Sequence, residues 1–110
     1  MVSVVIKRDQ SGDGVGFSCN GHAGYAEKGS DVICAAISTL TWTAVLALEK
    51  LTKIRLKIQK NAAKGRLECC WNSIPAEMEK VNLIIQVMVI GLQDIAAQYP
   101  EYLNVSEVEV

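Results

Sequence analysis

The sequence predicts a single domain of the α/β (α+β) class, with the element order ββ-α-ββ-α-β and a mixed, largely antiparallel sheet. Two pairs of segments alternate apolar and polar residues with period two, and each pair is joined by a glycine-containing turn, which is typical of β-hairpins. A long apolar segment of helical character follows each pair. Because hairpins here alternate with helices, we expect both helices to pack on the sheet.

The first hairpin is expected within the first twenty residues. Residues 9–14 form its turn, since their glycines can take positive φ. The apolar positions alternate on both sides of it: Val2, Val4 and Ile6, then Val15, Phe17 and Cys19. Residues 21–30 are interpreted as a loop because they show no periodicity. Ser30 or Asp31 can cap the following helix, expected from about Val32 to Lys50.

The second hairpin is expected over residues 53–71. Residues 53–60 alternate strictly, residues 61–65 form a turn, and the next segment places three apolar side chains on one face: Leu67, Cys69 and Trp71. Pro75 precedes a second helix, from about Ala76 to Gln98, which Pro100 stops. Residues 102–110 form the last strand.

Length and composition favour one folded domain over residues 1–110. Half of the 110 residues are hydrophobic and the net charge is −1, which argues against disorder and against a general polyanion binder. No signal peptide is visible, and polar residues interrupt the most apolar run, residues 81–95, so it is not read as a membrane span. We therefore expect a cytoplasmic protein whose four cysteines are reduced.

Charge and apolar surface suggest two interactions. Seven cations occur with no carboxylate among them: Lys50, Lys53, Arg55, Lys57, Lys60, Lys64 and Arg66. This strip is either a solvated strand face or a surface that attracts nucleic acid or an acidic peptide. A contact with RNA or the ribosome would run through Lys53, Arg55 and Lys57, and hairpin 53–66 would then act as a binding module. Both helices are apolar nearly all round, which predicts a homodimer formed through helix faces.

One stretch carries candidate chemistry. His22, the only histidine, precedes Cys34 by twelve positions. If Asp31 caps the helix, Cys34 lies in its first turn, where unpaired N–H groups and the helix dipole favour a thiolate. A glycine-containing loop can bring His22 back as its base. The alternative is a buried structural thiol and an incidental histidine.

The residues around this pair allow more than one role each. Asp31 either caps the helix or orients His22, and Ser38 either contacts a loop or substrate or bonds back to the helix. Trp42 is interpreted as a core or interface residue. A zinc site built from cysteines and His22 is disfavoured, because Cys69 and Cys70 face opposite sides of a strand, so no metal is expected.

The motif as a whole resembles the ribosomal-processing cysteine protease family (Prp). The family pattern is Gly-His-Ala, a mobile loop, then Asp-x-x-Cys-Ala-Ala-x-Ser, and the sequence matches it at eight positions: Gly21, His22, Ala23, Asp31, Cys34, Ala35, Ala36 and Ser38. The resemblance covers essentially the whole chain. It implies a cysteine endopeptidase with Cys34 as nucleophile and His22 as general base, supported by Asp31, Ser38 and Gly21.

The resemblance also implies the substrate. Such proteases remove a short N-terminal extension from large-subunit ribosomal protein twenty-seven, after a phenylalanine-containing motif and before a small residue, in support of ribosome assembly. They work in the cytoplasm without a cofactor and look dimeric. We expect the loop that includes Ala23, Gly24, Gly29 and Ser30 to be mobile and to close over the peptide, with the two glycines as hinges.

Overall fold

The predicted fold class is confirmed by a computed structural model, which describes residues 1–21, 28–61 and 63–110. The elements follow the expected order ββ-α-ββ-α-β, with a short 3₁₀ turn at Pro75–Glu77 before the second helix. Their bounds are β1 Val2–Arg8, β2 Gly14–Asn20, α1 Lys28–Leu51, β3 Leu56–Asn61, β4 Arg66–Trp71, α2 Met78–Gln98 and β5 Leu103–Glu109.

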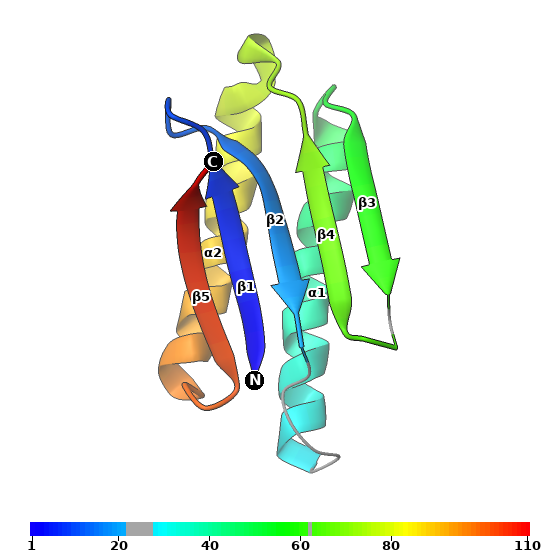
Figure 1. The fold of residues 1–110 in the computed structure, drawn as a ribbon, viewed down its shortest axis with the longest axis vertical. Helices are drawn as coiled ribbons and strands as arrows, with labels where there is room; N and C mark the ends of the chain where they lie inside the picture. The colour runs from blue at the N-terminus through cyan, green and yellow to red at the C-terminus, as the bar shows by residue number, and fades with distance from the viewer. Residues whose placement is uncertain (22–27, 62) are drawn as a thin grey trace.

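The sheet has the strand order β3-β4-β2-β1-β5. Its neighbours pair antiparallel except β1 and β5, which are parallel, so the sheet is mixed and largely antiparallel as expected. Figure 1 shows both helices behind the same face of the sheet, with α2 behind β1 and β5. The result is a two-layer domain with its core between sheet and helices.

Strand alternation sets the core. Val2, Val4 and Ile6 are buried, and Phe17 and Cys69 pair directly across β2 and β4. Leu67, Cys69 and Trp71 share the buried face, as predicted. The Phe17 and Trp71 rings meet edge to face with centroids 6.5 Å apart, and the indole N–H of Trp71 donates to the Gly14 carbonyl at 2.9 Å. The largest core side chain therefore also has its polar atom satisfied.

The second hairpin begins later than predicted. β3 starts at Leu56, which pairs with Trp71, the last residue of β4. Residues 53–55 have no opposing strand residues, so their alternation does not make a ladder. The buried Glu77 carboxylate instead accepts the Lys53 backbone N–H at 2.6 Å, and it lies 3.8 Å from the Lys80 ammonium. This contact ties the end of α1 to the start of α2.

Both helices are long and apolar enough, by length and composition, to cross a bilayer. In this domain each covers the sheet with one side: α1 through residues such as Ile37 and Leu48, and α2 through residues such as Ile85 and Leu92. Many of the apolar side chains of both helices are therefore buried in the core. A second apolar face on α2 remains exposed: Leu83, Val87 and Ile90 are 62%, 62% and 59% exposed.

Candidate active site

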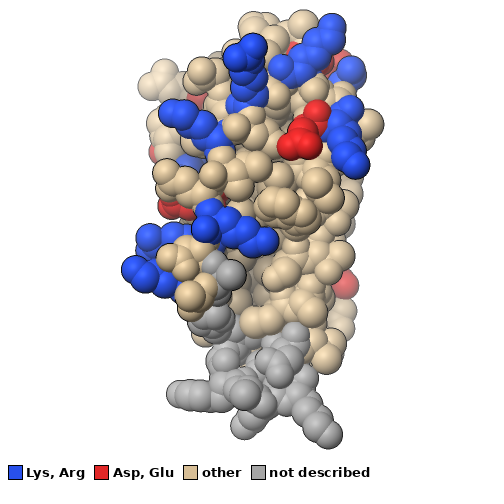
Figure 2. Space-filling model, turned by 90° about the vertical axis from the view of Figure 1, so that its right-hand side faces the viewer, with Lys and Arg blue, Asp and Glu red and all other residues tan. Residues whose placement is uncertain are grey.

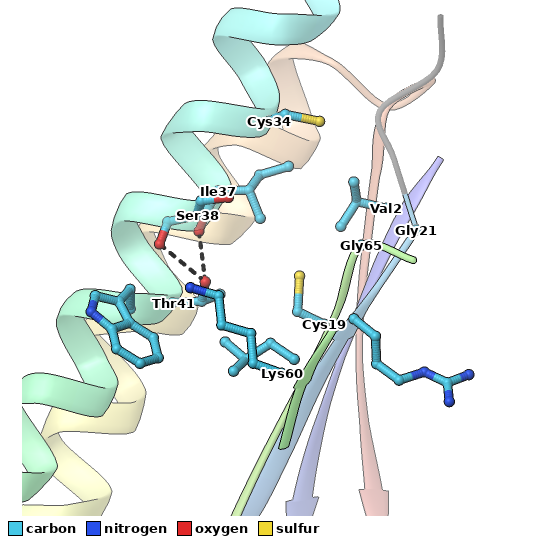
Figure 3. A pocket seen from close by; sticks show the side chains of 12 residues that line it. Val2, Cys19, Gly21, Cys34, Ile37, Ser38, Thr41, Lys60 and Gly65 are labelled. Atoms are coloured by element: carbon cyan, nitrogen blue, oxygen red, sulfur yellow. Dashed lines mark hydrogen bonds between the residues drawn. The ribbon is translucent and has the colours of Figure 1, made fainter. Parts of the chain in front are cut away.

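A cleft of about 250 Å³ opens between α1 and the β3–β4 hairpin, beside the end of β2. Figure 3 shows the Cys34 side chain reaching into it from α1, Cys19 from β2, and Lys60 from the hairpin toward α1. Its lining residues come from four strands or their ends and one helix: Val2, Cys19, Gly21, Cys34, Ile37, Ser38, Thr41, Trp42, Lys60, Gly65, Arg66 and Leu67.

Cys34 is partly exposed in this cleft and packs against the core cluster. The expectation that it lies in the first helical turn is wrong, because α1 begins at Lys28 and Cys34 is its seventh residue. The unpaired N–H groups of a helix belong to its first four residues, and the dipole effect fades beyond the first turn. Cys34 therefore lies beyond the helix-terminal groups on which that expectation rested.

The same early start corrects the loop assignment. Gly29, Ser30 and Asp31 belong to α1, so Ser30 and Asp31 are not its N-cap and Gly29 is not in a loop. His22, Ala23 and Gly24 lie outside the described residues.

Ser38 lies one turn after Cys34 and lines the cleft with it, as the four-residue spacing predicts. Thr41, the next polar residue inward, is buried, and its hydroxyl lies 3.0 Å from the Ile37 carbonyl and 3.3 Å from the Ser38 carbonyl. Thr41 is thus satisfied by its own helix. Ser38 is exposed and presents a polar side chain beside the cysteine.

Gly21 has a structural reason to be glycine. Its φ is +103°, in the left-handed region, and a Cβ there would overlap the carbonyl oxygen of Met1. Its N–H donates to the Gly65 carbonyl at 2.9 Å, which joins the end of β2 to the β3–β4 turn. This residue fixes where the chain leaves the sheet immediately before His22.

The other cysteines fit structural roles. Burial raises the pKa of the Cys19 thiol to about 11, with a smaller contribution from Cys34, and burial raises that of Cys69 to about 12 with a contribution from Cys70. Cys19 is therefore a neutral, apolar part of the cleft wall at neutral pH. Within residues 1–21, 28–61 and 63–110, no three His, Cys, Asp or Glu residues are grouped to hold a metal ion.

Trp42 and Lys60 were not anticipated as cleft residues. The interpretation of Trp42 as a core residue is wrong, since it is 36% exposed and lines the cleft, and its role at an interface stays a prediction. The Lys60 ammonium lies 4.6 Å from the centroid of its ring, a cation–π contact between α1 and β3. The four-residue spacing of positions 34, 38 and 42 could have indicated that Trp42 shares the cleft. No sequence pattern indicates its contact with Lys60.

The basic strip forms a surface. All seven of its Lys and Arg side chains are exposed, and Figure 2 shows cations gathered on the side of the molecule formed by β3 and its flanking loops. Across the described part of the chain, the ion pairs are Arg8–Glu107 and Lys80–Glu77, neither of which involves the strip. Lys60 and Arg66 extend this charge to the cleft.

Comparison with known proteins gives one consistent result. The sequence matches the family described as cysteine protease Prp over residues 1–104. It is 28% identical over 108 residues to the ribosomal processing cysteine protease Prp of Bacillus subtilis, covering 96% of both chains. It is similar to an essential ribosomal processing protease Prp from S. aureus, solved with a substrate peptide and with a covalently linked product peptide; each structure has a TM-score of 0.85 at 27% identity, covering 98% of this chain and 100% of the other.

Proposed function

The chain belongs to the cysteine protease Prp family, and we propose that it is a cytoplasmic endopeptidase that removes the N-terminal extension of large-subunit ribosomal protein twenty-seven. The cysteine protease domain would span residues 1–110. The observation that carries the proposal is the family match over residues 1–104 together with a cleft that exposes the motif cysteine, Cys34. The covalently linked product peptide of the S. aureus relative supports a covalent mechanism.

In the proposed mechanism Cys34 is the nucleophile and His22 the general base. His22 takes the thiol proton, and the thiolate attacks the scissile carbonyl to form a tetrahedral intermediate. Its collapse releases the new amine, which receives the proton from His22, and leaves a thioester on Cys34. Water activated by His22 then hydrolyses the thioester. Ser38, beside Cys34 in the cleft, is placed to contact the bound peptide.

The cleavage itself is tested with a synthetic peptide that spans the extension junction, with its phenylalanine-containing motif and the small residue after it. We expect the purified protein to cut it once, after the motif, because the motif occurs once in the peptide. Mass spectrometry identifies the two products. A peptide with the same composition in scrambled order is the control, and equal cutting of both would contradict the proposed specificity.

The same protein is proposed to act as a homodimer through α2. Leu83, Val87 and Ile90 recur at helical spacing and face away from the sheet, so a second copy would cover apolar surface that the monomer leaves in water. In a symmetric dimer both copies carry a given substitution, so the interface contains it twice.

Val87→Asp should therefore weaken the dimer by about a hundredfold or more, because two carboxylates would enter an apolar interface. Sedimentation equilibrium of the variant and the wild-type protein measures this. Asn104→Asp, at an exposed position of β5 that follows the buried Leu103, introduces the same charge on the sheet face opposite the helices and should leave association unchanged. A wild-type protein that stays monomeric at high concentration would refute the proposal.

A second candidate activity is weak, salt-dependent RNA contact through the basic strip. It is favoured by seven exposed cations outside the ion pairs of the described residues, and by few apolar side chains among them, which suits phosphates better than a protein partner. The strip would dock the protease near its ribosomal substrate.

Neutralising Lys53, Arg55 and Lys57 to glutamine together should lower the slope of log affinity against log salt by about two to three units, since each lost phosphate contact removes released counterions. Fluorescence anisotropy with a structured RNA gives the slope. Lys7→Gln, on the distant strand β1, is the control. An unchanged slope in the triple variant would mean that the strip is a solvated strand edge.

A further inference from the structure

Five residues of α1 line the cleft, and three of them form a row along the helix. Cys34, Ser38 and Trp42 are spaced by four residues and all face the same cavity. A helix rises 1.5 Å per residue, so Trp42 lies about 12 Å along the axis from the proposed nucleophile. An extended peptide advances about 3.3 Å per residue. The distance from Cys34 to Trp42 therefore corresponds to between three and four residues of bound peptide.

The Trp42 ring is held at that end of the cleft. The Lys60 ammonium lies 4.6 Å from the ring centroid, and this contact joins the two walls of the cleft because Lys60 belongs to β3 and Trp42 to α1. The ring remains 36% exposed and lines the cavity, as does the mostly buried Leu67. The surface offered to a ligand here is thus largely aromatic and aliphatic, with a cation at its edge.

We propose that Trp42, positioned by Lys60, forms a subsite for an apolar substrate side chain three to four residues from the scissile bond. This inference rests on the proposed protease function and names one determinant of its specificity. An apolar side chain would cover the exposed part of the indole. A lysine or arginine at the same substrate position would be disfavoured by the charges of Lys60 and Arg66, which also line the cleft.

The experiment is an alanine scan of a cleaved peptide, measured as kcat/KM on the wild-type protein and on Trp42→Ala. In the wild type, alanine in place of the apolar residue at the subsite should cost about tenfold to thirtyfold. In Trp42→Ala the intact peptide should already be slower by that factor, and the same peptide change should cost less than about threefold. The coupled position should lie three or four residues from the cut.

Leu46→Ala is the matched control. Leu46 is one turn further along α1 and 37% exposed, close to the value for Trp42, but it does not line the cleft. It should retain the full tenfold to thirtyfold penalty of the peptide change. Trp42→Phe should keep most of the discrimination, because an aromatic ring stays at the subsite. If Trp42→Ala is poorly folded by circular dichroism, Trp42→Gln takes its place, since a polar side chain there should also remove the penalty.

The outcomes separate the two proposals. If the wild-type protein cuts no peptide, the protease proposal fails and the subsite fails with it. If the wild type cuts but Trp42→Ala, or Trp42→Gln in its place, shows the full alanine penalty at every position, the subsite alone is refuted. Coupling to a residue adjacent to the scissile bond, or a preference for lysine at the coupled position, would also overturn it.

Discussion

Replacing Cys34 with alanine should reduce cleavage of the junction peptide by about 10⁴-fold or more. Among the described residues that line the cleft, nothing replaces this nucleophile. Their hydroxyl groups belong to Ser38 and Thr41, and an ordinary hydroxyl is a poor nucleophile without its own activation. The remaining thiol of the cleft, Cys19, is kept neutral by burial, which raises its pKa to about 11. Product formation followed by mass spectrometry gives the rate.

Cys70→Ala is the matched control for the Cys34 variant. Cys70 is exposed on β4 and does not line the cleft, so its loss should leave the rate unchanged while removing one alkylation site. Both variants should unfold at nearly the wild-type temperature. If the Cys34→Ala protein still cuts the peptide at a rate within tenfold of wild type, Cys34 is not the nucleophile.

His22→Ala belongs to the same assay and should cost about 10² to 10⁴-fold, the usual contribution of a general base. Combining it with Cys34→Ala should add little, because groups that act as one unit are strongly non-additive. A double variant much slower than Cys34→Ala alone would show that His22 acts on another step. This comparison tests the pairing directly, although His22 lies outside the described residues.

Sequence patterns predicted the sheet well because they follow directly from burial. Val2, Val4 and Ile6 alternate since every second side chain of β1 faces the helices. The start of α1 was missed because residues 28–31, Lys-Gly-Ser-Asp, contain no apolar position and include two residues typical of caps. The start of β3 was missed because alternation cannot show where the partner strand β4 ends.

The candidate site likewise has features that local sequence patterns predict and features that only the folded chain brings together. Cys34 and Ser38 share the cleft because helical spacing is a local property, and the sequence gives it directly. The contact between Trp42 and Lys60 joins residues eighteen positions apart across two elements, and no local pattern indicates it. The geometry of Gly21 likewise depends on Met1 and Gly65, its neighbours only in the folded sheet.

Gly21→Ala should destabilise the protein by about 2–4 kcal/mol. A left-handed backbone costs an alanine about 1–2 kcal/mol, and overpacking against fixed atoms typically adds about 1–3 kcal/mol. Here the new Cβ would overlap the carbonyl oxygen of Met1, the residue directly before β1. Because β1 is held between β2 and β5, this carbonyl cannot move aside easily. Urea unfolding of wild type and variant gives the difference.

Gly12→Ala separates the two costs. Gly12 also has positive φ, +86°, but its Cβ would meet nothing within 4 Å. It should therefore cost only the conformational part, about 1–2 kcal/mol. The additional loss of unfolding free energy in Gly21→Ala, compared with Gly12→Ala, measures the clash with Met1. Gly21 directly precedes His22, so a shift of the chain that relieves the clash should also displace the proposed base. We therefore expect Gly21→Ala to lower kcat more than it raises KM. Equal destabilisation by the two alanines would show that Gly21 is required for its backbone angle alone.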